Sequence, residues 1–306
     1  MSGQQVRGQS AVGQPVAGST AEDLMYRVPR PSLGESRSAR VTRAILLGMF
    51  VVFMALFIMG PLAWLGIRAF SGTWHYPHLL PSAWTLKWWK QVFDDPTLFD
   101  AIKLSLTLTP VVTAASMVVC LPAAYAFARF DFPGRRFFLV AMFATNAFPR
   151  TGLFIAMASL FYSLNIMSTF TGLVVIQLIG TIVFMTWIPA AAFAAVPPSL
   201  EEAARDAGAG PLRVFASVTF PLAAPGILVA VILSFLAAFD EAQGTYFIGA
   251  PNYVTMPTVM YTLVQHYPDQ VSAVFSIMLS VPSVLLMLLV RKRVMGGALA
   301  EGFQLR

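Results

Sequence analysis

Long apolar runs without a charged side chain recur along this chain, and they restrict its fold more than any other feature. One run extends from Ala44 to Ile67 and contains no ionisable residue. In helical form, about 18 to 25 such residues cross the roughly 30 Å hydrocarbon core of a bilayer. Backbone N–H and C=O groups find no hydrogen-bond partner in lipid, so runs of this length fold as helices, in which these groups bond to one another. The sequence therefore predicts an all-α protein whose solvent is the membrane.

Six runs qualify as spans, and the composition agrees with a polytopic membrane protein. Only 11% of the 306 residues are charged, whereas about 25% is usual in a soluble domain. The third run is interrupted by Asn146, Pro149 and Arg150, and the fifth contains Asp240 and Glu241. The predicted spans cover residues 44–67, 104–128, 137–164, 171–196, 222–249 and 271–290.

The basic residues set the predicted orientation. The net charge is +6, but the Lys and Arg residues form short clusters at the ends of apolar runs rather than a basic stripe for nucleic acid. Short flanks rich in Lys and Arg lie on the cytoplasmic side, so we expect both termini in the cytoplasm. We divide the chain into a disordered cytoplasmic tail (1–40), a six-helix transmembrane domain (41–293) and a cytoplasmic C-terminal tail (294–306). A segment rich in tryptophan, 68–100, is expected at the membrane surface.

The most structured polar segment lies between the fourth and fifth spans, at about 197–221. Ser199 followed three residues later by Glu202 fits a capping box and predicts that a helix starts there. Gly208 is suited to end this helix, and Pro211 fits the first turn of a second one. The pattern predicts a helix-turn-helix that projects into the cytoplasm.

This segment resembles the signature of the permease subunits of binding-protein-dependent type I ABC importers. The family's signature is Glu-Ala-Ala, three residues, Gly, nine residues, Ile, one residue and Leu-Pro, before the penultimate span. The spacing is complete, with valine for isoleucine and phenylalanine for leucine. The matching residues are Glu202, Ala203, Ala204, Gly208, Val218, Phe220 and Pro221.

The resemblance implies that this loop couples the permease to an ATPase. Its predicted coupling residues are Glu201, Glu202, Ala203, Ala204, Asp206, Gly208, Val218 and Pro221. The chain contains no G-x-x-x-x-G-K-[ST] phosphate loop, so ATP and Mg are expected on a partner subunit, and no cofactor or metal is expected here. The expected assembly contains a second permease, two ATP-binding subunits and an extracytoplasmic solute-binding protein in the cell inner membrane, with no nucleic acid.

Three charges within predicted spans need an explanation, because an unpaired intramembrane charge is costly. Arg150, Asp240 and Glu241 lie at similar depth from the predicted cytoplasmic face. They either line the solute pathway or form an ion pair between the third and fifth spans. Neighbouring polar groups extend this set, which comprises Arg150, Asp240, Glu241, Asn146, Gln243 and Tyr246, with Gln177 as a further hydrogen-bonding group.

The substrate class is less constrained than the transport class. Small residues after the sixth span, at Gly296, Gly297 and Gly302, resemble the carbohydrate-importing branch, whereas Phe239-Asp240-Glu241 resembles the polyamine-importing branch. We favour a carbohydrate or polyol, with a polyamine or another small solute as the alternative.

Two other classes of membrane protein compete with an importer. An integral membrane enzyme needs clustered catalytic groups, but the histidines are scattered and the single cysteine, Cys120, lies in an apolar run. An ion-coupled secondary transporter is expected to show inverted repeats or more spans. We therefore expect a non-enzymatic transport subunit.

Overall fold

The computed structural model describes residues 37–74, 78, 80–144 and 149–302, of which residues 37–40 and 289–302 are described by their backbone alone. Of the expected tail, residues 1–36 lie outside the described part of the chain and residues 37–40 lie within it. Within the described residues there is no β-strand, only an isolated bridge between Ser71 and Trp84. The elements are α2 (Arg37–Phe70), α3 (Lys87–Asp94), α4 (Pro96–Arg129), α5 (Arg135–Ala144), α6 (Arg150–Ser163), α7 (Phe170–Ala195), α8 (Pro198–Asp206), α9 (Pro211–Val214), a π-helix η2 (Phe215–Thr219), α10 (Phe220–Phe239), α11 (Gln243–Gly249), α12 (Met256–His266) and α13 (Asp269–Gly302).

Five helical segments of the described chain are long and apolar enough to cross a membrane. The expected third span is two helices, α5 and α6, which flank residues 145–148 outside the described part. The expected fifth span ends at Phe239, earlier than predicted, so Asp240 and Glu241 do not lie within one continuous helix. The five segments are Val41–Phe70, Pro96–Arg129, Phe170–Ala195, Pro211–Phe239 and Asp269–Leu288.

The chain divides into two compact units, residues 1–58 and 59–306. In the described part of the first unit, α2 presents large apolar side chains on all sides, and Leu56 and Phe57 are among the most exposed. A helix that is apolar all round is suited to lipid. The second unit holds all the other helices.

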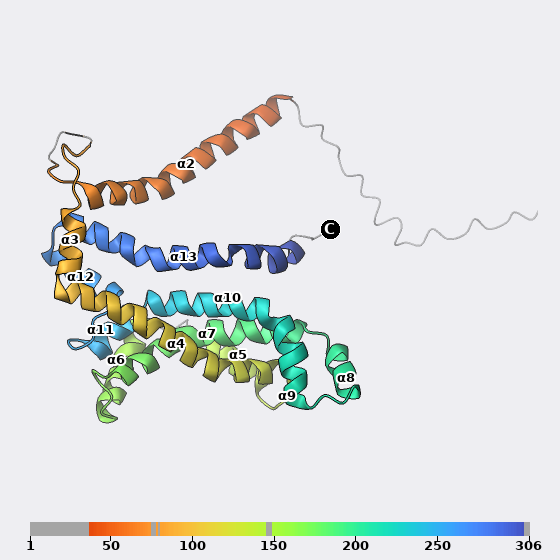
Figure 1. Ribbon diagram of the computed structural model, residues 1–306. Helices are drawn as coiled ribbons and strands as arrows, with labels where there is room; N and C mark the ends of the chain where they lie inside the picture. The colour runs from red at the N-terminus through yellow and green to blue at the C-terminus, as the bar shows by residue number, and fades with distance from the viewer. Residues whose placement is uncertain (1–36, 75–77, 79, 145–148, 303–306) are drawn as a thin grey trace, which may run out of the picture. The chain divides into compact units, whose positions relative to one another are not determined.

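Three long helices, α4, α7 and α10, pack side by side in the second unit (Figure 1). Their shared core contains Cys120, Met185 and Ala230 at the centre and Phe193 nearer one end. Small residues allow close packing, since a Cβ at Gly226 of α10 would lie only 2.5 Å from the Cβ of Ala192 on α7. Cys120 is buried among these helices.

Contacts distant in sequence complete one end of this helix packing. The Met256 backbone N–H at the start of α12 donates to Ser105 Oγ of α4 at 2.8 Å, across 151 residues. The Tyr267 hydroxyl donates to Asp95 Oδ2 at 2.9 Å, while Asp95 Oδ1 caps α4 by accepting from Thr97 N. The helices α8 and α9 lie at the opposite end of α4, α7 and α10 (Figure 1).

Candidate functional site

The short helix α8 begins with prolines rather than with a serine cap. Pro198 occupies its first turn, and no side chain caps its N-terminus, so the predicted Ser199–Glu202 capping box is wrong. Proline suits the first helical position because its missing N–H has no intrahelical partner there. Gly208 has a φ of +84° and follows the last turn, where a left-handed residue ends a helix, as predicted. Pro211 opens α9, also as predicted.

A buried carboxylate joins α8 to the neighbouring helices. Glu201 is 4% exposed, and its Oε1 accepts from Arg129 Nη2 at 2.7 Å and from Thr219 Oγ1 at 2.7 Å. Arg129 Nη2 also donates to the Val196 carbonyl at 2.9 Å. These contacts join the ends of α4 and α7, the helix α8 and the π-helix η2. We call Arg129, Val196, Glu201 and Thr219 the latch.

Sequence reasoning grouped Glu201 with the other coupling residues but did not find the latch. In the sequence, Arg129 is one of several basic residues that follow the second apolar run, and it lies 72 residues from Glu201. The one available signal was an arginine at the end of an apolar run with an acidic residue in the next polar segment. That signal names no partner.

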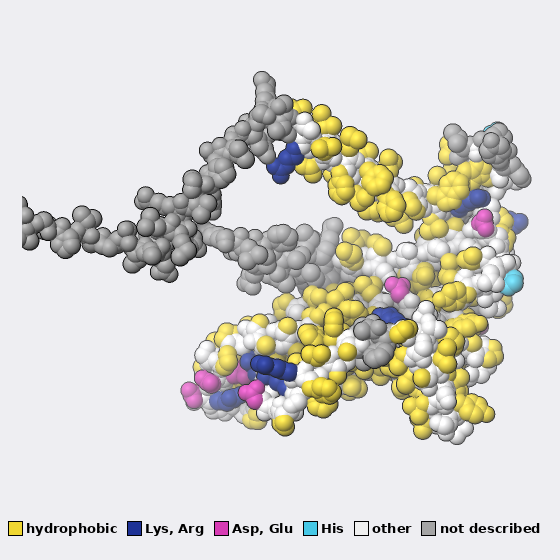
Figure 2. All heavy atoms as spheres, turned by 180° about the vertical axis from the view of Figure 1, so that it is seen from behind, with side chains coloured by type: hydrophobic (Ala, Val, Ile, Leu, Met, Phe, Trp, Pro, Cys, Tyr) yellow, Lys and Arg dark blue, Asp and Glu magenta, His cyan; other side chains and the backbone are white. Residues whose placement is uncertain are grey.

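The other predicted coupling residues form the accessible part of this loop. Glu202, Ala203, Asp206, Gly208 and Pro221 are exposed. Ala204 and Val218 are half-buried, and Leu212 of α9 is 84% exposed. Figure 2 shows charged side chains of both signs gathered at the end of the second unit that carries α8 and α9.

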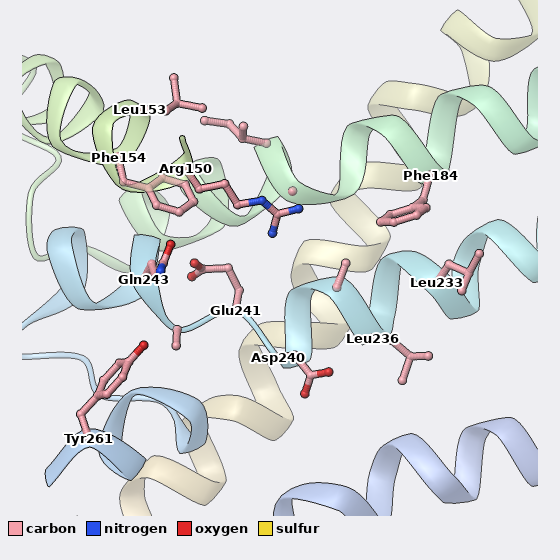
Figure 3. A pocket seen from close by; sticks show the side chains of 14 residues that line it. Arg150, Leu153, Phe154, Phe184, Leu233, Leu236, Asp240, Glu241, Gln243 and Tyr261 are labelled. Carbon is pink, nitrogen blue, oxygen red and sulfur yellow. The ribbon is translucent and has the colours of Figure 1, made fainter. Parts of the chain in front are cut away.

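A cavity of about 600 Å³ lies among α6, α7, α10 and α12, away from the latch. Arg150, Asp240, Glu241 and Gln243 line it together with apolar and aromatic side chains that include Phe184 (Figure 3). Four of the six predicted pathway residues therefore come together. Tyr246 lies on the adjacent α11, and Asn146 lies outside the described residues.

The predicted ion pair of Arg150 with Asp240 or Glu241 is not formed. Among the described residues, the salt bridges within 4.0 Å do not include Arg150. Figure 3 shows the Arg150 guanidinium and the Glu241 carboxylate entering the same cavity from opposite walls. For Glu241, the reason is that its carboxylate has other hydrogen-bond partners.

Glu241 caps the start of α11. Its Oε1 accepts from Gly244 N at 2.6 Å, and its Oε2 accepts from the N–H and the hydroxyl of Thr245, each at 2.8 Å. The buried Gln177 of α7 donates through Nε2 to Thr245 Oγ1 at 2.9 Å. Carboxylates stabilise helix starts by accepting from free backbone N–H groups. Glu241, Thr245 and Gln177 therefore fix α11 to α7, and Gln177 is part of this network rather than of the cavity wall.

A second cavity, of about 360 Å³, meets the first at Gln243 and Tyr261. It contains Tyr246, the fifth predicted pathway residue among those described. Sequence reasoning missed Tyr261 and Gln265, which lie on the short helix α12. Among the described residues, no group of three or more His, Cys, Asp or Glu side chains is arranged to hold a metal. The lining residues of the second cavity are Thr151, Gln243, Tyr246, Phe247, Tyr261 and Gln265.

Comparison with known proteins identifies relatives over most of the chain. Residues 120–294 match the family described as "Binding-protein-dependent transport system inner membrane component". The maltodextrin transport system permease protein MdxG of Bacillus subtilis is 26% identical over 87% of this chain and 98% of its own. The trehalose/maltose transport system permease protein MalG of Thermococcus litoralis is 26% identical over 85% of this chain and 96% of its own. The diacetylchitobiose uptake system permease protein NgcG of Streptomyces coelicolor is 27% identical over 88% of this chain and 89% of its own.

A solved structure shares the fold. A chain of a bacterial ABC transporter involved in the import of the acidic polysaccharide alginate superposes with a TM-score of 0.63. It is 20% identical and covers 84% of this chain and 98% of its own length. The likeness establishes a common helical architecture for the two chains.

Proposed function

Because the chain belongs to the family of binding-protein-dependent inner-membrane transport components, the permeases of type I ABC importers, we propose that it translocates a small carbohydrate without altering it covalently. It is a multi-pass protein of the inner membrane and a transport component rather than an enzyme. Three of its relatives are named for maltodextrin, trehalose and maltose, and diacetylchitobiose. These names support a neutral saccharide as the solute.

The work of transport is supplied by partner subunits in this proposal. ATP and Mg are bound by two ATPase subunits, and a second permease completes the pathway. A solute-binding protein delivers the sugar from outside. Both termini and the α8–α9 loop face the cytoplasm, which agrees with the basic clusters at Arg129, Arg135, Arg136 and Arg213.

The observation that carries the proposal is the latched α8–α9 loop. It presents exposed motif residues for an ATPase while Glu201 ties it, through Arg129 and Val196, to two spanning helices. A push on α8 is therefore passed directly to α4 and α7. We propose that this motion opens and closes the cavity between α6, α7 and α10, at the other end of the same helices.

Reconstituted transport tests the function. The chain is co-expressed with its partner permease, ATPase and solute-binding protein, and the complex is placed in proteoliposomes containing ATP. We expect ATP-dependent uptake of labelled maltotriose, trehalose or diacetylchitobiose, and none when the phosphate-loop lysine of the ATPase is replaced. Uptake of spermidine alone would refute the carbohydrate assignment and keep the importer class, whereas uptake that is independent of ATP would refute both.

A further inference from the structure

The second cavity differs chemically from the first. Its six lining residues carry no charge, whereas the first contains Arg150, Asp240 and Glu241. Two tyrosines meet edge to face in it, with Tyr246 and Tyr261 ring centroids 6.2 Å apart and an interplanar angle of 74°. Both tyrosines are about half exposed rather than packed in the apolar core. Exposed aromatic rings beside a polar cavity are suited to contact a ligand.

The groups around these tyrosines fit a neutral ring that carries hydroxyls. Gln243 and Gln265 each provide an acceptor oxygen and two N–H donors, so one amide can bond two neighbouring hydroxyls. A tyrosine ring supplies a flat apolar face with a polar tip, which suits the C–H face of a sugar ring. A charged ligand would lose hydration here without meeting an opposite charge. The volume of about 360 Å³ lies within the usual range for small-molecule pockets, about 300–1,000 Å³.

The tyrosines are carried by helices with fixed ends. Glu241 and Thr245 hold the start of α11, which bears Tyr246. The start of α12, which bears Tyr261, is held by Ser105 and by a bond from Thr258 Oγ1 to the Ala242 carbonyl at 3.4 Å. Rigid elements lower the entropy cost of binding. The cavity is therefore a preformed surface rather than a gap between mobile loops.

We propose that Tyr246, Tyr261, Gln243 and Gln265 form a subsite that binds the ring of a neutral sugar before it enters the charged cavity. The proposal rests on the carbohydrate importer function proposed above. The two cavities share Gln243 and Tyr261, so a solute passes from one to the other without leaving these side chains. Figure 3 shows Tyr261 reaching from α12 toward the side of the first cavity where Gln243 and Glu241 lie. The subsite selects by aromatic stacking and amide bonding, and the charged cavity follows it.

Uptake by the reconstituted complex tests the subsite with labelled maltotriose, trehalose and diacetylchitobiose. With the saccharide that the unaltered complex accepts, Tyr261→Ala and Tyr246→Ala should each reduce uptake about tenfold or more at subsaturating sugar, as truncation of a buried aromatic contact does. Tyr261→Phe keeps the aromatic ring, so its uptake should stay within about threefold of that of the unaltered complex. Matched controls are Val264→Ala, an exposed residue of α12 outside the cavity, and Tyr162→Ala, an exposed tyrosine of α6. Both should transport normally.

A binding measurement separates recognition from folding. A cysteine is introduced at Thr151, a lining residue that is not among the four proposed to bind the sugar, in a Cys120→Ala background, and the full complex is treated with a small maleimide. The accepted saccharide should slow the modification at least threefold, and spermidine should not. If uptake and protection are unchanged in both alanine variants, the subsite is wrong and the importer function stands. If the unaltered complex accepts none of the three saccharides, the carbohydrate function is wrong and the sugar subsite is overturned with it.

Discussion

Arg129 at the end of α4 and Glu201 in α8 form a buried ion pair, with Nη2 and Oε1 2.7 Å apart and both side chains largely shielded from solvent. The same guanidinium nitrogen bonds the Val196 carbonyl, and the same carboxylate oxygen accepts from Thr219. One pair of side chains thus fixes the position of the loop that we propose to contact the ATPase.

Replacing one member of the Arg129–Glu201 pair, Glu201, should destabilise the protein more than replacing both. Glu201→Gln strands the buried Arg129 guanidinium, whereas Arg129→Met leaves Glu201 with Thr219 and the more distant Arg205, at 3.7 Å. Glu201→Gln alone should therefore cost about 3–5 kcal/mol and Arg129→Met less, and the double variant should cost less than the sum of the two. Thermal unfolding of the purified complex measures this. The exposed pair Lys103–Asp100 is the matched control, and Lys103→Met there should change stability by about 0–1 kcal/mol. Additive losses in the Arg129/Glu201 double variant would contradict the latch.

Gly208 should tolerate asparagine better than alanine. Its φ of +84° costs an L-residue about 1–2 kcal/mol, less for asparagine, and a Cβ there meets no atom within 4 Å, so the cost is conformational. Gly208→Trp should in addition abolish uptake while the subunit still inserts, because its bulk stands where the ATPase is expected to bind. Gly210→Ala is the control, since Gly210 has a φ of −68° and equally open surroundings. Normal uptake and ATP hydrolysis in Gly208→Trp would exclude a coupling role.

Asp240 and Glu241 should separate in their effects although they are adjacent. Glu241→Ala removes three hydrogen bonds at the start of α11 and should lower stability by about 1–3 kcal/mol. Asp240 is exposed at the cavity, so Asp240→Asn should leave the melting temperature unchanged and reduce uptake. Arg150→Met combined with Asp240→Asn should be additive in stability, since the two residues form no ion pair. A double variant more stable than either single one would restore the pairing hypothesis.

The proposed orientation can be tested with single cysteines. In a Cys120→Ala background, a cysteine at the exposed Ser199 of α8 should resist an impermeant maleimide applied to intact cells. A cysteine at Asp269, at the opposite end of the second unit, should react. Reaction of both positions after the membrane is permeabilised shows that each is accessible. The reverse pattern in intact cells would overturn the orientation.

The Tyr267–Asp95 bond predicts a loss of stability at high pH. The hydrogen bond to Asp95, with burial and the charge of Asp95, raises the pKa of Tyr267 above its usual value of 10.0. A pKa raised on folding means that the neutral phenol is favoured in the folded state. Its contribution is complete below about pH 10 and is lost as the pH rises through the folded pKa. Tyr267→Phe should be less stable at neutral pH and should lose less on going to high pH, measured by unfolding at both.

The helices that depend on local sequence were predicted well. The fourth span was expected at 171–196 and is Phe170–Ala195, since an uncharged run is followed there by Pro197 and Pro198. The second begins eight residues before its expected start, at Pro96, where Asp95 caps it. Asp-Pro is a readable start signal, but hydropathy alone gave more weight to the apolar residues that follow.

The features that sequence reasoning missed depend on distant partners. The apolar pattern continues from α10 into α11, so the sequence predicts one span where the structure has a break at Asp240. Glu202 carries the family spacing, yet Glu201 is buried because Arg129 and Thr219 surround it. Tyr261 was not identified because its role depends on its packing opposite Tyr246, fifteen residues earlier, which no local periodicity encodes.

The bond between Ser105 and Met256 also sets an order on biosynthesis. Its two ends are 151 residues apart, so a ribosome adding about 5–20 residues per second separates them by about 8–30 s. During that interval α4 is already made while the start of α12 does not yet exist, and the Ser105 hydroxyl has to be satisfied within the newly inserted chain or by water. A nascent chain arrested before residue 256 therefore has α4 in place without the backbone N–H that Ser105 accepts from in the folded chain.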